Sequence, residues 1–200
     1  MTSKPHLKGF DYPPFLIPQE NGTEFELWEE VTYTASQGDS WVIPEGFRTD
    51  FASIPAVVSW AVPKLGAYTL AAIVHDLLCT GLNGWYRATK HVHGNVAASD
   101  WVVAIDGIPR PTASAVDTDA IFHRIARDHG TDPVTAKLLW VGVRWGALFN
   151  PARRAGWLKT APAVLGWSLL FAPVLVPATV IAGVGRVVLG AVRRLFRART

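Results

Sequence analysis

Residues 66–79 read Gly-Ala-Tyr-Thr-Leu-Ala-Ala-Ile-Val-His-Asp-Leu-Leu-Cys, and this stretch decides how the rest of the chain must pack. Apolar side chains occupy every side of the helix that it predicts, and a helix that is apolar all round is normally buried. Its centre nevertheless carries His75 and Asp76. Burying an ionised carboxylate costs several kcal/mol unless it is paired or hydrogen-bonded. We therefore expect a buried helix whose polar pair either lines a cleft or meets partners inside the core.

The sequence before this helix favours strands. Residues 25–35 alternate and are rich in strand-forming residues, and residues 40–43 resume the pattern after a Gln37–Gly38–Asp39 turn, so a β-hairpin is predicted. Residues 1–24 contain several prolines and an Asn-Gly turn signal, which predicts an irregular lead-in or an edge segment.

Helices dominate the later part of the chain. Ser114 is placed to cap a helix that ends near Gly130, and Asp132–Pro133 begins another that reaches about Phe149. Residues 80–113 are expected to form loops, with a hairpin at about residues 101–109. Strands followed by helices predict an α+β fold, a small antiparallel sheet with helices, in a globular domain of residues 25–150.

The last fifty residues differ from the rest in charge and hydropathy. Residues 1–150 contain all sixteen acidic residues and eleven Lys or Arg, a formal charge of −5, whereas residues 151–200 contain eight Lys or Arg and no acid, a charge of +8. Residues 160–185 are uncharged, and a helix of this length is about 39 Å long, enough to cross a hydrocarbon core of about 30 Å. We expect a C-terminal membrane-embedded helix kinked at Pro173 and Pro177. The alternative is a buried core helix.

The residues on either side of the apolar segment indicate how it would lie in a membrane. Trp157 and Trp167 suit an interfacial aromatic belt, and residues 186–199 predict a short basic amphipathic helix on an anionic membrane surface. The same arginines could bind nucleic acid, but no interleaved aromatic residues support that partner. The excess of basic residues after the segment favours a cytoplasmic C-terminus. Residues 1–10 lack the apolar core of a signal peptide, however, so we favour a cytoplasmic globular domain with a single C-terminal span.

Two candidate site residues follow a turn in the strand-rich part. Asp50 and Ser53 precede a short apolar stretch, where either side chain could cap a helix by accepting free backbone N–H groups. In the alternative, Asp50 faces His75 as a metal ligand or base, and Ser53 is a further candidate catalytic residue beside His75 and Asp76 in the sequence pattern.

Further candidates lie on the predicted helices. Asp119 and His123 are four residues apart on the helix after Ser114 and share a face. Carboxylate and imidazole at this spacing can bind Zn, Mn or Fe, and the alternative is an exposed pair. His91 and His93 would share one face of a strand and form a second candidate pair. Cys79 lies in the apolar helix and is expected to be a core residue.

Two long motifs resemble a known family. The run Ile-Pro-Glu-Gly-Phe-Arg-Thr-Asp-Phe-Ala-Ser-Ile-Pro at 43–55, followed by Gly-Ala-Tyr at 66–68 and Ala-Ala-Ile-Val-His-Asp at 71–76, is similar to the phage- and prophage-associated family of unknown function number 1353. Asp-Ala-Ile-Phe at 119–122 resembles its third motif. The resemblance covers roughly residues 25–149 and implies a phage or prophage origin, but no activity.

The chain departs from that family at three places. The family usually has an aromatic residue where Cys79 stands and an Arg where Ala115 stands, and residues 84–113 resemble an insertion. Arg87 or Arg110 could replace the missing arginine in space.

Two functions are compatible with these features. In one, Asp50, His75, Asp76, Asp119 and His123 hold one divalent ion (Zn, Mn or Fe), which generates hydroxide for a hydrolase acting at the cell envelope. In the other, the polar residues are structural, and the chain is a membrane-anchored, non-enzymatic virion, lysis or exclusion module with lipid and other phage proteins as partners. We favour the second, because the sequence contains no phosphate-binding loop, nucleophile elbow, zinc-protease motif or dinucleotide fingerprint.

Overall fold

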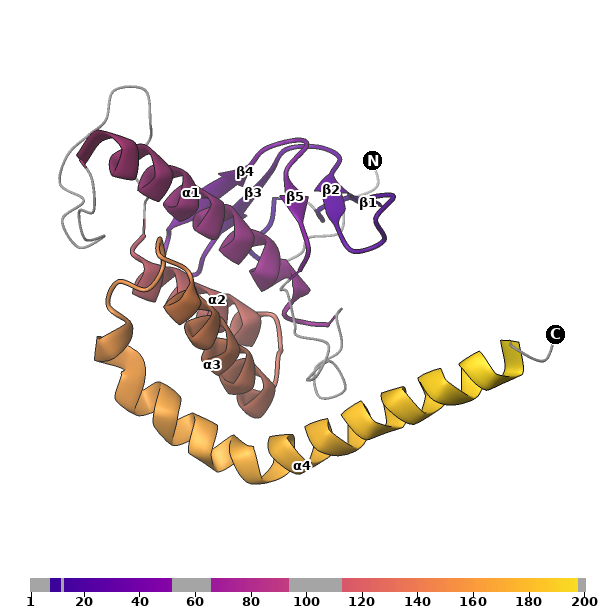
Figure 1. Cartoon of the computed structure of the whole chain (residues 1–200). Coiled ribbons are helices and arrows are strands. Elements are labelled where there is room, and N and C mark those ends of the chain that lie inside the picture. The colour runs from indigo at the N-terminus through magenta and orange to yellow at the C-terminus, as the bar shows by residue number, and fades with distance from the viewer. Residues whose placement is uncertain (1–7, 12, 52–65, 94–112, 198–200) are drawn as a thin grey trace.

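The structure, a computed structural model, describes residues 8–11, 13–51, 66–93 and 113–197. Within these residues, short strands come first and four helices follow, so the α+β class predicted from the sequence is confirmed (Figure 1).

The strands form two small antiparallel sheets. In one, the order is β1 (Leu16–Pro18), β2 (Phe25–Leu27) and β5 (Arg48–Thr49); in the other, β3 (Val31–Thr34) pairs with β4 (Ser40–Ile43). The predicted hairpin is therefore confirmed, and β1 is the expected edge segment.

The prediction of one strand over residues 25–35 is wrong. The chain bends at residues 28–29, and the two halves pair with different partners. Residues 28–30 are all exposed, so the alternation of buried and exposed side chains that holds a strand on the core stops there.

The four helices pack in chain order. They are α1 (Thr69–His93), α2 (Ala115–Asp128), α3 (Pro133–Phe149) and α4 (Trp157–Arg197). Helix α1 lies between the strands and α2, α2 contacts α3, and α3 contacts α4 (Figure 1). The main core therefore lies where α1 meets the strands and α2, as the apolar sequence of α1 predicts.

Local capping sets the boundaries of α2 and α3 as predicted. The Asp117 amide donates to Ser114 Oγ over 3.2 Å, and Asp132 Oδ1 accepts from the amides of Val134 and Thr135. Gly130, at φ 88°, follows the end of α2 in the left-handed conformation that glycine adopts without strain.

Helix α1 is longer than the sequence predicts. We expected loops after Cys79, but the helix continues to His93. Leu82, one turn beyond Leu78, extends the buried stripe and outweighs Gly81 and Gly84, each of which costs about 1 kcal/mol in a helix. The predicted hairpin at 101–109 lies outside the described residues.

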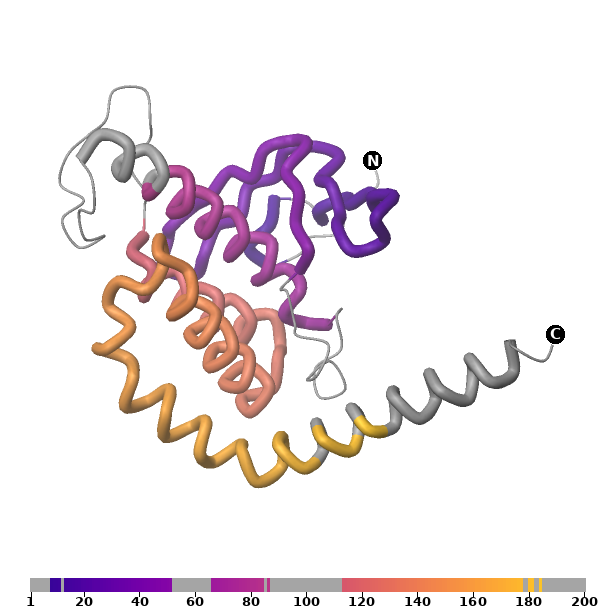
Figure 2. The backbone as a smooth tube through the Cα atoms, in the orientation of Figure 1, coloured from indigo at the N-terminus to yellow at the C-terminus, as the bar shows by residue number. Residues whose placement is uncertain are grey.

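Helix α4 has two parts. Its first turns pack on α3, and the rest extends away from the body after a bend where its colour passes from orange to yellow (Figure 1); the tube in Figure 2 follows the same path. Pro162, Pro173 and Pro177 lie inside it, and each proline removes a backbone hydrogen bond and bends a helix. Residues 186–197 are helical, as the sequence predicts, and their helical backbone is continuous with that of the apolar segment.

Candidate functional site

The polar centre of the described chain is Asp119 on α2, whose side chain is 0% exposed. Its Oδ1 lies 2.8 Å from His75 Nε2 and 2.6 Å from Arg153 Nη2, and its Oδ2 accepts from Arg144 Nη1 over 2.8 Å. We call His75, Asp119, Arg144 and Arg153 the buried charge cluster. One carboxylate thus holds three nitrogen-bearing side chains together.

Four segments supply the members of this cluster. His75 comes from α1, Asp119 from α2, Arg144 from α3 and Arg153 from the loop between α3 and α4. Arg144 is itself fixed, since its Nε donates to Thr160 Oγ1 on α4 over 3.1 Å. Its Nη1 also lies 3.5 Å from the carbonyl of Ala115. The cluster therefore connects all four helices.

Asp76 forms the outer edge of the cluster. Its Oδ1 lies 3.8 Å from His75 Nδ1, and its Oδ2 accepts from Thr49 Oγ1 over 2.5 Å. The same hydroxyl accepts from the amide of Phe51, which stands at φ 60°. Asp76 therefore connects α1 to the end of β5 through the side-chain hydroxyl of Thr49.

Burial and neighbouring charges oppose each other in setting the pKa values. Burial alone lowers the pKa of His75, but hydrogen bonds with Asp119, Asp76 and Cys79 outweigh it and raise that pKa well above 6.5. Burial alone raises the pKa of Asp119, but the hydrogen bond with His75 and the charges of Arg153 and Arg144 bring it below 3.8. Both shifts favour the charged forms, so the cluster is ionic.

The structure brings three of the predicted site residues together: His75, Asp76 and Asp119. Asp50 is exposed just after β5, away from the core. His123 is half-buried on α2; burial and the charges of Lys137 and Arg127 lower its pKa.

Other candidates fall outside this group. Ser53 and Arg110 lie outside the described residues, and so does the predicted short helix that Asp50 or Ser53 would cap. His91 and His93 have helical backbones, so the strand expected there is wrong, and residues two apart on a helix do not face each other. The exposed-pair alternative for Asp119 and His123 is also wrong, because Asp119 is fully buried.

The donor set does not resemble a metal site. Among the described residues, no three His, Cys, Asp or Glu side chains lie where they could hold a metal ion. Both oxygens of Asp119 accept hydrogen bonds from guanidinium groups, which a divalent cation would have to displace. Cys79 is buried as expected, with its Sγ 3.6 Å from His75 Nε2.

Sequence reasoning missed the two arginines. The signal for Arg144 was present, because it is the only charged residue between Lys137 and Arg153 and lies on an otherwise apolar helix. This is the same signal that singled out His75 and Asp76. Arg153 carried no such signal, since it stands beside another arginine at the start of the basic tail.

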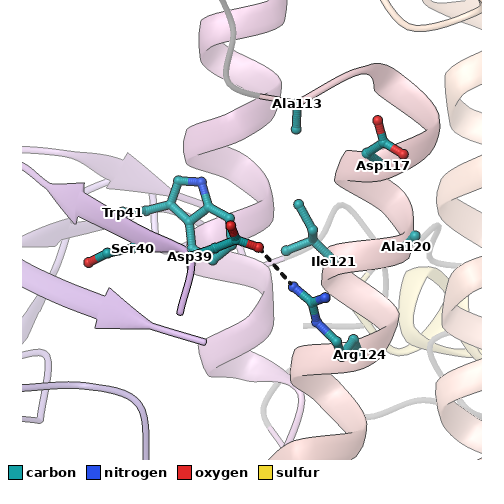
Figure 3. A pocket seen from close by; sticks show the side chains of 8 residues that line it. All are labelled: Asp39, Ser40, Trp41, Ala113, Asp117, Ala120, Ile121 and Arg124. Carbon is teal, nitrogen blue, oxygen red and sulfur yellow. Dashed lines mark ion pairs between the residues drawn. The ribbon is translucent and has the colours of Figure 1, made fainter. Parts of the chain in front are cut away.

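An open cleft lies elsewhere, between the β3–β4 hairpin and α2. It has a volume of about 600 Å³, and its lining includes Trp41 and an ion pair of 3.7 Å between Arg124 and Asp39 (Figure 3). No predicted site residue and no member of the buried charge cluster lines it. Its walls carry both charges, so their electrostatics favour no particular ligand.

Comparisons with known proteins give a family but no activity. A family model described as "Protein of unknown function (DUF1353)" matches residues 25–143. An "Uncharacterized protein y4jT" from Sinorhizobium fredii (strain NBRC 101917 / NGR234) is 38% identical over 58 residues, which are 28% of this chain and 17% of that protein. No solved structure matches. The matched range contains His75 and Asp119 but ends one residue before Arg144.

Proposed function

Because the chain belongs to DUF1353, a family of proteins of unknown function, we propose its role from its own structure: a membrane-anchored, non-enzymatic module whose buried charge cluster fixes helix α4 to the globular body. A phage or prophage setting, as a virion, lysis or exclusion component, is part of this proposal. That setting rests on the resemblance of the motifs at 43–55 and 71–76.

One observation carries the membrane anchoring. Within residues Trp157–Pro177 of α4, an 18-residue stretch has a mean hydropathy of 1.6, and only 6% of that stretch is buried in the protein. The core helix of a soluble protein is equally apolar but is mostly buried. Large contiguous apolar surfaces are rare on soluble monomers and mark contacts with membranes or partners.

The buried charge cluster supports a structural role for the polar residues. Asp119 and Arg144 are wholly buried, and each is already bonded to other side chains of the cluster or of α4. A general acid or base must reach a proton on its substrate. The cluster instead joins the helices: Arg144 bonds α2 and α4, and Arg153 fastens the loop that leads into α4.

No described contact supports a metal ion at Asp119, so the structure gives the hydrolase hypothesis no support. Nucleic-acid binding by residues 186–199 gains no support either, since their side chains lie outside the described part of the chain.

Membrane fractionation of the full chain tests the anchoring. We expect the wild type to sediment with membranes and to resist an alkaline carbonate wash. Val180→Arg combined with Ile181→Arg should release it, because both side chains are exposed and their loss leaves the core intact, whereas an arginine in the bilayer core costs about 3 kcal/mol or more.

Val42→Arg is the matched control. Val42 is an exposed apolar residue on β4, and this variant should stay with the membranes. A wild-type chain found in the soluble fraction, or an α4 variant that fractionates like the wild type, would contradict the proposal.

A further inference from the structure

We propose that α4 enters the bilayer only after Phe171, at its proline bend, and that residues 157–171, the surface segment, lie flat on the membrane with their outer face among the lipid headgroups. This inference rests on the membrane anchoring proposed above. It adds the point of entry and the face of the body that touches lipid.

The surface segment cannot leave the body without breaking contacts. Trp157 Nε1 donates to the carbonyl of Arg144 over 2.8 Å, and Trp145 Nε1 donates to Ser168 Oγ over 3.0 Å. Val164, between them, is fully buried. Because α3 lies along this segment, a crossing that began at Trp157 would draw α3 and the body into hydrocarbon. Trp157 itself packs inside the protein, so it does not lie in the aromatic belt that the sequence predicts.

A second face of the surface segment, about 110° around the helix from the face that packs on the protein, is apolar and exposed. Leu158 is 83% exposed and Leu169 is 74% exposed, with Leu165 between them. At about 100° per residue, positions 158, 165 and 169 fall on one side of the helix. A helix with protein against one face and exposed leucines on the next suits a membrane surface, where its apolar face lies in the headgroup boundary.

A lysine and two tryptophans mark the level of the headgroups. Lys137 Nζ lies 4.8 Å from the ring centre of Trp140 on α3 and 5.8 Å from that of Trp167 on α4. Tryptophan concentrates at the membrane interface, and an ammonium group is costly in hydrocarbon. From Pro133 onward the sequence contains no Asp or Glu, so no carboxylate opposes anionic lipids along α3 or α4.

Beyond Phe171 the helix is free to insert. Phe171 still packs against the cluster of α3 and α4, and α4 then bends away from the body; Pro173 and Pro177 account for such a bend (Figure 1). Residues 172–185 are uncharged, which gives about 21 Å of helix, longer than half of a hydrocarbon core of about 30 Å. Ile181 is exposed and lies ten residues after Phe171, about 15 Å along the axis and so near the bilayer midplane.

Depth-dependent fluorescence quenching tests the entry point. Leu165→Cys, Ile181→Cys and Val42→Cys are made in the full chain, labelled with an NBD dye and reconstituted into phosphatidylcholine–phosphatidylglycerol vesicles that carry nitroxide lipids at a shallow or a deep position. The unmodified chain gives the background, because Cys79 is buried. We expect stronger shallow than deep quenching at Leu165, the reverse at Ile181, and neither at Val42 on β4.

The outcomes separate this inference from the anchoring itself. Deep quenching at Leu165 equal to that at Ile181 would mean that α4 crosses from its start, which overturns the surface segment but keeps the anchor. A dye at Leu165 that is shielded from water yet not quenched by either lipid would mean that a second copy of the chain covers the face, which also overturns it. No quenching at Ile181 would refute the anchoring proposal.

Discussion

Replacing Asp119 by Asn should destabilise the protein far more than its small change in volume suggests. The variant keeps the shape of the side chain but removes the charge that Arg144 and Arg153 share. Arg144 is 0% exposed, so its guanidinium cannot turn to water. Breaking a buried ion pair by removing one partner costs about 3–5 kcal/mol, because the other charge stays buried and unpaired.

Urea unfolding of the full chain in mild detergent measures this loss. Tryptophan fluorescence reports the unfolding, and the free energy is compared at one pH for wild type and Asp119→Asn. Asp39→Asn is the control, because its ion pair with Arg124 is partly exposed and such pairs contribute about 0–1 kcal/mol. A loss for Asp119→Asn no larger than that of the control would refute the reasoning.

A double-mutant cycle separates the lost pair from general damage. Arg144→Met removes the buried cation while filling a similar volume. The double variant Asp119→Asn/Arg144→Met should be less destabilised than the sum of the single variants by about 0.5–3 kcal/mol, the usual coupling of contacting residues. Additive losses would show that the two side chains are not coupled.

Three other changes have expected outcomes. The stability that protonated His75 contributes is fully present below pH about 6.5 and is lost as the pH rises through its raised folded pKa. The free energy of unfolding in urea should therefore fall more steeply above pH about 6.5 for wild type than for His75→Gln. Gly156→Ala should cost about 1–3 kcal/mol in the same assay, since φ is 72° and the new Cβ would lie 2.8 Å from Val116 Cγ2; Gly22→Ala, with open space around it, should cost less. Thr49→Val should cost about 1–3 kcal/mol, because it removes a hydroxyl that both donates and accepts a hydrogen bond.

The elements that the sequence predicted correctly are those with local signals. Ser114, Gly130 and Asp132 set helix ends through contacts within three or four residues, so their effect can be read without the fold. The prediction of a loop after Cys79 was wrong because the deciding contact is tertiary and not local. There, the burial of Leu82 in the tertiary structure overrides the glycines at 81 and 84.

Some residues of the candidate site could be predicted from the sequence, but their partners could not. A charged residue on an apolar element indicates a buried polar contact, and this signal found His75 and Asp76, whereas Asp119 was found by its spacing to His123. The identity of the partners was not predictable, because Arg144 and Arg153 lie 25 and 34 residues from Asp119 and reach it only through the packing of α2 against α3. The metal hypothesis arose from that gap, since a cation was needed and its source was unknown.

The order in which the cluster is synthesised has a consequence for biogenesis. A ribosome makes Asp119 before either arginine, and domains fold as the chain emerges. Until Arg153 has emerged from the ribosome, the carboxylate of Asp119 lacks one of its two arginine partners. The ion pairs that complete the cluster therefore form only after the start of α4 has been synthesised, so the final packing of the globular part depends on residues at its C-terminal edge.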